Sequence, residues 1–571
     1  MIRFRPKLLD TLPGYDRAQF AGDFSSGITV GVLALPLAMA FAIASGMTPA
    51  AGIWTAIVAG FLVAALGGSR VQIGGPTGAF IPIIYVIVVD HGVQNLLIAT
   101  MMSGLMLLAM GAFKLGTMIR FIPLSVVTGF TNGIAVVIFI SQIKDFLGLR
   151  IESLPGEFFG KMEALVGALD TIDPPTVALA VASLLVLVGW NRLARTVAWM
   201  RRLPGPLAVL ILATAVNALF HLPVDTIGSR FGGIPQTLPT IGLPEMSLST
   251  LGKLISPALT IALLGAIESL LSARVADNQI DDRHDPNQEL MAQGLANVAA
   301  PLFGGFAATG AIARTATNIR SGGRTPVAGM IHALVLLAVV LVAAPLASHI
   351  PLATLSAIVV VVAINMGEWH ALKWSELRRY SRQYRTILLG TFLITVVFDL
   401  TLAVEIGMVL ASLFFMYRMS DLTRIERIPL ERYRGYEHYY ELEPLARADG
   451  SERVVAFRLF GSLFFGAANK LEALLSSAEG NPDAVVLDLE KVINIDTTGL
   501  DVLQTFERSL RKRGIALILC DLNAQPRSIV ERSGFAQRLG ADNIVGKIND
   551  ALIRAQHLRP RRPADAQTDP I

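Results

Sequence analysis

The sequence predicts a polytopic α-helical membrane domain followed by a small α/β domain, and three observations support this fold class. Hydrophobic residues make up 53% of the 571-residue chain and charged residues only 16%, whereas soluble proteins carry about 25% charged residues. The mean hydropathy is +0.57. Apolar runs continue to about Tyr417 and then stop, and the remainder alternates short β-type and helical patterns. We therefore expect two domains.

Fourteen apolar segments are candidate spans, because a full crossing of a bilayer needs about 20 apolar residues. Two of them are short for a full crossing, near residues 76–90 and 308–319. The others lie near residues 28–45, 51–66, 95–113, 121–143, 176–190, 206–220, 254–273, 289–303, 326–344, 350–366, 386–398 and 400–417.

Lysine and arginine indicate the orientation, because they are concentrated in cytoplasmic loops. With the basic N-terminus inside, the inner loops hold most bases of the membrane domain, and the outer connections 146–175 and 221–253 are poor in them. An even number of spans then places both termini in the cytoplasm, at the inner membrane. Loop charge explains the net charge of +4, so no nucleic-acid partner is expected. The single Cys520 excludes a disulfide framework and fits a reducing cytosol.

The third and tenth segments resemble each other. Gly74-Gly-Pro-Thr-Gly-Ala-Phe-Ile81 in the third is similar to Gly304-Gly-Phe-Ala-Ala-Thr-Gly-Ala-Ile312 in the tenth. Short, glycine-interrupted spans at corresponding positions indicate a binding site between inverted repeats. A spacing of seven spans predicts a 7+7 inverted repeat. The competing interpretation of either motif alone is a glycine that permits close helix packing.

Half-helices that begin in mid-membrane would form an anion site at this position. Their first N–H groups are unpaired and carry a partial positive charge. We expect the two ends to begin at Pro76 and Thr77 and at Thr309 and Gly310, with glycines that allow close approach of the substrate.

Arg314 lies about one helical turn beyond Gly310, where it would add a bidentate donor for a carboxylate or another oxyanion. A charge inside an apolar span costs about 2.5–3.5 kcal/mol on insertion scales and normally marks a substrate or ion pathway. The alternative is that Arg314 extends to the cytoplasmic interface near Arg320.

Glu268 is the second charge in an apolar span, and we expect it to couple transport to an ion. Its surroundings of Leu263, Leu264, Ile267 and Leu271 favour the neutral carboxyl, which would bind and release a proton. Ser272 lies at i+4, on the same helical face. The pair could instead hold Na⁺, which we rank below H⁺, or Glu268 could be a static counter-ion to Arg314. No other cofactor is expected.

The sequence gives no indication of a metal site, of ATP-driven transport or of catalysis. The acidic inner loop from Asp277 to Glu289, which includes His284, matches no metal-ligand spacing, and we interpret it as a solvated loop. The chain has no GxxxxGK[ST] run that would indicate ATP-driven transport, and no nucleophile–base pair. We therefore expect no metal site, no catalytic residue and no enzyme.

These residues resemble the sulfate permease (SulP) family over nearly the whole chain. The most specific stretches are Gly265-Ala-Ile-Glu-Ser-Leu-Leu271, Ala313-Arg-Thr-Ala-Thr-Asn318 with Ser321-Gly-Gly-Arg-Thr325, and Pro36-Leu-Ala-Met-Ala-Phe41. The resemblance implies a UraA-like fold of fourteen spans, a core and a gate domain, an elevator-like movement and a homodimer in the lipid bilayer.

The resemblance also implies that the anionic substrate binds between the third and tenth spans, with contributions from the first and eighth. Carried over by position, the expected substrate-binding residues are Ala38, Phe41, Thr77, Gly78, Ala79, Thr309, Gly310, Ala311 and Arg314, and the expected ion-coupling residues are Glu268 and Ser272.

The C-terminal part resembles a STAS domain through its stretch from Val485 to Gly499. Short β-type runs at 454–459, 484–489 and 515–520 alternate with helical patterns at 466–478, 498–512, 526–538 and 543–556. In bacterial relatives the loop can carry a phosphorylated serine. Thr497 and Thr498 occupy this region, and we favour a helix-capping role for Thr498. A cytosolic protein partner of the domain is also left open.

The expected boundaries are a cytoplasmic N-terminal segment at 1–25, a transmembrane anion-transport domain at 26–420, a STAS domain with its linker at 421–557 and a disordered tail at 558–571. Family members carry sulfate, bicarbonate, chloride or dicarboxylates. Sodium-coupled bicarbonate members have Asp at the position of Glu268 and no Arg at that of Arg314. The combination here most resembles the bacterial C4-dicarboxylate (succinate, fumarate) branch, with sulfate close behind. An uncoupled exchanger or channel, or a sensor that acts through the STAS domain, shares this architecture.

Overall fold

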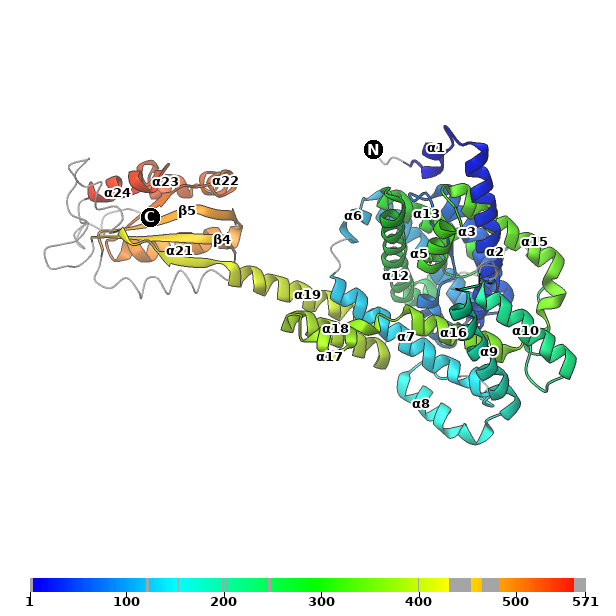
Figure 1. Cartoon of the computed structure of the whole chain (residues 1–571). Helices are drawn as coiled ribbons and strands as arrows, with labels where there is room; N and C mark the ends of the chain where they lie inside the picture. The colour runs from blue at the N-terminus through cyan, green and yellow to red at the C-terminus, as the bar shows by residue number, and fades with distance from the viewer. Residues whose placement is uncertain are drawn as a thin grey trace. The chain divides into compact units, whose positions relative to one another are not determined.

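The computed structural model of the chain (Figure 1) describes residues 4–119, 123–151, 154–194, 196–197, 200, 204–239, 241–244, 248–398, 400–430, 453–464 and 482–558. The chain divides into two compact units, Met1–Val409 and Leu410–Ile571, and each is described by itself. The predicted helix at 466–478 and all but the first residue of the predicted tail lie outside the described residues.

Six helices of the described chain are long and apolar enough to cross a membrane. They are α2 (Arg17–Ala44), α3 (Pro49–Leu66), α5 (Val93–Ala112), α7 (Leu124–Leu147), α12 (Leu248–Ile280) and α15 (Pro326–Ala347). Local signals fix several of their ends: Asp16 accepts a hydrogen bond from the Gln19 N–H before α2, Pro49 is the first residue of α3, and Gly148 ends α7 in the left-handed conformation.

The remaining predicted spans coincide with eight other helices, so each of the fourteen corresponds to a helix of the described chain. These elements are α4 (Ile81–His91), α9 (Pro174–Leu193), α10 (Gly205–Phe220), α13 (Pro286–Ala299), α14 (Ile312–Arg320), α16 (Leu352–Met366), α18 (Arg382–Val397) and α19 (Leu400–Leu422). α14, at nine residues, is too short to span a bilayer. It is a half-helix, as the glycine pattern predicts.

The helices of the membrane unit pack in two groups. In the first, α2, α3 and α15 pack together, and α5 packs against α12 and α13. In the second, α7 packs against α16 and α18, and α9 packs against α10 and α16. The first group contains the helices α2 to α5 and α12 to α15. The second contains the helices α7, α9, α10, α16, α18 and α19. Each group therefore draws on both halves of the sequence, as an inverted repeat requires.

The second unit contains a five-stranded sheet of order β3-β4-β5-β6-β7. β3 (Arg424–Arg427) is antiparallel to β4 (Val454–Leu463), and β5 (Ala484–Ile495), β6 (Ala516–Cys520) and β7 (Ile544–Val545) continue in parallel. Both faces are covered, which explains the continuously apolar strands. Alternate residues Val455 and Phe457 join the core with α21 (Thr497–Lys512), α22 (Ala524–Arg532) and α23 (Phe535–Leu539), while Val454 and Ala456 face α24 (Ile548–Gln556).

The three predicted strands and the helices at 498–512 and 526–538 are confirmed, the second of these helices as two short ones. The predicted helix at 543–556 begins only at Ile548, after strand β7, and neither β3 nor β7 was predicted. The predicted cap of α21 is wrong. Asp496, not Thr498, precedes the helix, and its Oδ1 accepts from the Gly499 N–H at 2.6 Å. Thr498 is the second residue of the helix, where its hydroxyl is past the capping position, and both Thr497 and Thr498 are exposed.

Candidate functional site

The two glycine-interrupted segments pair with each other, at what we call the crossing, in the buried interior of the membrane unit. β1 (Gly74–Gly75) pairs antiparallel with β2 (Thr309–Gly310), and the Ala311 N–H donates to the Ile73 carbonyl at 2.8 Å. α14 begins immediately after β2. A 3₁₀ turn, η1 (Gly78–Phe80), leads from β1 into α4. Both half-helices therefore begin at the crossing, where the first N–H groups of a helix lack helical partners. This is the arrangement in which an anion cradle is expected.

The crossing requires glycine at two positions. Gly75 has φ +143°, and a Cβ there would lie 2.6 Å from Arg314 Nη1. A Cβ on Gly310 would lie 1.9 Å from Gln72 Nε2. Any other residue would displace a buried polar side chain at either position, so the glycines permit the close approach of the two backbones.

Arg314 lies inside this crossing and does not extend to the interface. Its side chain is 2% exposed, and Nη2 donates a hydrogen bond to the Pro76 carbonyl. Nη1 is buried and has no hydrogen-bond partner among the described residues. The interpretation of Arg314 as an interfacial residue near Arg320 is therefore wrong for this conformation. A buried guanidinium with a free N–H is a donor for an oxyanion.

Glu268 on α12 reaches the same crossing through Thr77. The carboxylate is half-buried, and its Oε2 accepts from Thr77 Oγ1 at 2.8 Å. No ion pair joins the described side chains of Glu268 and Arg314, which bind Thr77 and Pro76 separately. The static salt bridge is therefore not formed here. One turn earlier on α12, the Gly265 carbonyl accepts from Thr309 Oγ1 at 2.9 Å and ties β2 to this helix.

Ser272 does not contact Glu268, although the two residues share a helical face. It is fully buried, and its Oγ donates to Thr315 Oγ1 at 3.4 Å. Thr315 Oγ1 also accepts from the Ile73 N–H at 3.0 Å. In this conformation Ser272 supports the backbone of the crossing, and it contributes no ligand next to the Glu268 carboxylate.

The other expected residues are buried and have apolar side chains or none. Ala79 follows Gly78 in η1, and Ala311 precedes α14. Ala38 and Phe41 are buried on α2, which packs against α4 and α16. None of their side chains can donate or accept a hydrogen bond, so only their shape is available to a binding site.

A network around Glu289 supports the crossing, and sequence reasoning missed it. Glu289 on α13 is fully buried and accepts from the backbone N–H groups of Gly68 and Ser69 at 2.9 and 3.2 Å. Its Oε1 accepts from Gln72 Nε2 at 3.0 Å and Ser269 Oγ at 3.3 Å. The assignment of Glu289 to a solvated loop is wrong, because the chain enters α13 before this residue and carries it inside.

Two asparagines hold the second half of the crossing. Asn297 makes paired hydrogen bonds with the backbone of Ala308, at 3.0 Å to its carbonyl and 2.7 Å from its N–H. Asn318 donates to the Val71 carbonyl at 2.8 Å and accepts from Ser26 Oγ at 2.7 Å. An uncharged amide within an apolar span is a sequence signal that identifies both asparagines.

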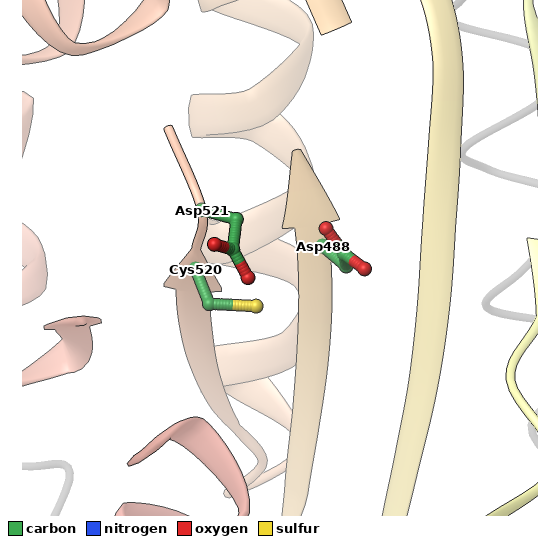
Figure 2. Close-up of side chains that lie close together, drawn as sticks. All are labelled: Asp488, Cys520 and Asp521. Carbon is green, nitrogen blue, oxygen red and sulfur yellow. The ribbon is translucent and has the colours of Figure 1, made fainter. Parts of the chain in front are cut away.

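A second polar cluster lies in the C-terminal unit (Figure 2). Asp488 on β5, Cys520 at the end of β6 and Asp521 bring their ligand atoms within 4.8 Å of one another. Asp488 already pairs with Arg458 at 2.6 Å, and Asp521 accepts from the Ile548 N–H at 3.1 Å. Burial, reinforced by Asp488, raises the pKa of the Cys520 thiol far above its ordinary value, and a neutral thiol is a poor metal ligand. The cluster is explained by these contacts.

The fold and the crossing of two half-helices define a multi-pass membrane transporter. A model of the sulfate permease family matches residues 20–389, and a model of the STAS domain matches residues 446–551. The chain belongs to the sulfate permease family: it is an anion transporter and not an enzyme.

Two similar proteins are named for different anions, sulfate and bicarbonate. The chain is 42% identical over 529 residues to the putative sulfate transporter YvdB of Bacillus subtilis, covering 92% of this chain and 96% of that protein. It is 32% identical over 544 residues to the bicarbonate transporter BicA of Picosynechococcus sp., covering 94% of each.

Two solved structures show the same architecture. The transmembrane domain of a cyanobacterium bicarbonate transporter BicA aligns with a TM-score of 0.62 at 33% identity, over 68% of this chain and 98% of that one. Murine Slc26a9 in the inward-facing state aligns with a TM-score of 0.84 over 96% of this chain and 94% of that one. At 19% identity, this second likeness shows the fold alone.

Gly310→Ala should destabilise the membrane unit. The new Cβ would displace Gln72 and break its hydrogen bonds to Glu289 and Ser269, and each buried polar group left unpaired costs about 1–3 kcal/mol. The thermal unfolding temperature of the purified protein should fall by several degrees. Gly78→Ala is the control, because its Cβ would lie 3.6 Å from Val362, an ordinary contact. Equal behaviour of the two variants would contradict this account of the crossing.

Cys520 should resist alkylation in the folded protein. It is fully buried and its raised pKa keeps the thiol neutral at pH 8.5, where an unfolded thiol is about half ionised. Because burial favours the neutral form, ionisation of the unfolded chain should lower stability as the pH rises above about 8.5. We expect iodoacetamide to label the native protein at least about 100-fold more slowly than the denatured one, as measured by mass spectrometry.

The matched control is Thr498→Cys in a Cys520→Ser background, which places a thiol at an exposed position of the same unit. This thiol should react rapidly in the native protein. Rapid labelling of native wild type would show that Cys520 is accessible after all.

Proposed function

We propose that this protein is a secondary active transporter of the inner membrane that takes up a doubly charged anion together with protons. The anion is a C4-dicarboxylate (succinate or fumarate) or sulfate, and both termini lie in the cytoplasm. The observation that carries the proposal is Arg314, which is buried at the crossing and has one N–H group free.

The choice of a doubly charged anion follows from the two kinds of donor at the site. Unpaired N–H groups at the start of η1 and α14 together supply about one positive charge, which suits a monovalent anion. A guanidinium adds a full charge and geometry matched to a carboxylate or sulfate oxygen. The name of the Bacillus subtilis relative, a putative sulfate transporter, agrees with this class.

Proton coupling follows from the position of Glu268. Its carboxylate contacts Thr77 beside the proposed anion cradle and forms no ion pair with Arg314. An ionised carboxylate there would repel a dianion, so binding of the anion favours the protonated form. Anion and proton would then enter the site together and leave it together.

The movement we propose is an elevator-type displacement of one helix group past the other. It rests on the division of the membrane unit into two packing groups. The site belongs to the first group, since β1, β2, α12 and α14 all contribute to it. We propose a homodimer in the bilayer, and a cytosolic protein as the partner of the STAS domain.

Sodium-coupled bicarbonate transport is the second candidate. The relative from Picosynechococcus sp. is named a bicarbonate transporter. Glu268 and Thr77 also place a carboxylate and a hydroxyl oxygen together, and oxygen atoms are the ligands that hard cations prefer. An uncoupled anion exchanger or channel is the third candidate function.

Counterflow into proteoliposomes with sulfate, bicarbonate, chloride, succinate and fumarate tests the substrate class. We expect the divalent anions to exchange and bicarbonate and chloride to exchange weakly. Accumulation driven by an inward proton gradient without Na⁺ would support symport. A strict Na⁺ requirement would favour the bicarbonate mechanism, and uptake that never accumulates would favour an uncoupled pathway.

Glu268→Gln should separate anion exchange from proton coupling. The amide oxygen can still accept from Thr77 Oγ1, so the site should keep its geometry, but the side chain can no longer carry a proton. We expect counterflow to continue and acceleration by an inward proton gradient to disappear. Glu163→Gln, at an exposed carboxylate on α8 (Phe158–Gly167), is the control and should behave as wild type. An unchanged pH response of Glu268→Gln would refute the assignment.

Arg314→Ala should weaken divalent anions selectively. A hydrogen bond to a charged group is worth about 1.5–3 kcal/mol, so the affinity for succinate or sulfate should fall by roughly 10- to 150-fold. Chloride, held mainly by backbone N–H groups, should be affected less. Arg314→Lys should restore only part of the loss, because an ammonium cannot pair bidentately.

Binding assays with purified protein measure both effects. Equal weakening of chloride and sulfate would indicate that Arg314 acts only as a clamp on the Pro76 carbonyl.

A further inference from the structure

A cavity of about 350 Å³ lies away from the crossing, between the two packing groups of the membrane unit. α4 and α12 line one side, and α7, α18 and the start of α19 line the other. α8 contributes Phe158 and Lys161. Neither Glu268 nor Arg314 is among the lining residues, so this cavity is distinct from the anion site.

Most of the cavity wall is apolar. It includes isoleucine and valine side chains of α4 and α7, with Val396 and Phe398 at the end of α18. Polar groups are few: His91, Lys161, Ser256, Thr260, Thr395 and Glu405. Such a surface gives little to a small hydrated anion, which would lose its water without replacement.

Lys161 is the unusual member of this set. It is 5% exposed, and its ammonium lies 5.4 Å from the centre of the Tyr85 ring. Within the described chain the ammonium has no carboxylate partner and donates no hydrogen bond, whereas the backbone N–H of Lys161 donates to the Glu157 carbonyl at 2.9 Å. Buried lysines are rare without a partner, and burial here lowers the pKa of Lys161. An anion beside the ammonium would oppose that change.

The other titratable groups of the cavity leave this charge uncompensated. Glu405 also lines the cavity, but its carboxylate forms no ion pair with Lys161 among the described residues. His91 is in the last turn of α4 and is half-buried. The cavity therefore combines apolar walls with one buried, unpaired cation.

We propose that this cavity binds an amphipathic organic anion, a single-chain aliphatic carboxylate whose head group pairs with Lys161 and whose chain packs on the apolar wall. A volume of about 350 Å³ is at the lower end of the range for small-molecule sites, about 300–1,000 Å³. That size suits one medium-length chain. Because the walls come from both packing groups, the ligand contacts both and opposes their relative displacement.

Binding of decanoate to the detergent-solubilised full-length protein, measured by calorimetry, tests the proposal. Lys161→Met keeps the length of the side chain and removes its charge, and it should weaken decanoate by about 10-fold or more. Lys161→Arg should retain most of the affinity. Lys253→Met, at an exposed lysine of α12 outside the cavity, is the matched control and should bind as wild type.

Two further comparisons keep the test independent of folding. Decanol has the chain without the charge and should bind at least about 10-fold more weakly than decanoate. Gly156→Leu adds bulk at a lining position where a Cβ has ordinary contacts, 3.6 Å from Val86, and it should block binding while Lys161 remains. Thermal unfolding of each variant confirms that the protein is folded.

Three results would overturn the proposal. Equal binding of decanol and decanoate would show partition into an apolar surface without a role for the charge. Unchanged decanoate binding in a folded Lys161→Met variant would remove Lys161 from the site. Direct displacement of decanoate by succinate or sulfate would assign the cavity to the path of the transported anion instead.

Discussion

The pairing of Gly74–Gly75 with Thr309–Gly310 is the contact on which the rest of the membrane unit depends. Each strand contributes two residues, and such a short pairing is not stable alone. Broken helices are tolerated at membrane depth only where surrounding groups satisfy the freed backbone. Here the amides of Asn297 and Asn318 bond to the backbone that flanks the crossing, and Gln72 packs against Gly310. These polar side chains therefore stabilise the crossing inside an otherwise apolar unit.

Both charged residues of the crossing bind to neighbouring residues of one segment. Glu268 on α12 accepts from the Thr77 hydroxyl, and Arg314 on α14 donates to the Pro76 carbonyl. Any shift of the backbone at Pro76 and Thr77 therefore changes the surroundings of both charges at once. This shared attachment gives a physical route by which the protonation of Glu268 and the occupancy of the anion cradle can influence each other without a direct salt bridge.

Arg314 and Lys161 are both buried cations of the membrane unit, but their surroundings differ. Arg314 has one N–H group bonded and one free in a cradle of backbone N–H groups. Lys161 has only the face of Tyr85 beside it, within apolar walls. A hydrated dianion suits the first environment, where its water is replaced by donors, and an amphipathic carboxylate suits the second. The difference lies in the neighbours of each cation and not in its charge.

The sequence by itself determined the two domains, the fourteen apolar segments, three of the five STAS strands and the short glycine-rich pair, because hydropathy, periodicity and isolated charges are local signals. It could not determine which polar groups meet. Asp496 instead of Thr498 caps α21, Glu289 is inside and not in a loop, and Glu268 binds Thr77, 191 positions away in the chain. Only the tertiary structure decides such contacts, since they depend on distances between residues that the sequence separates widely and that packing alone brings together.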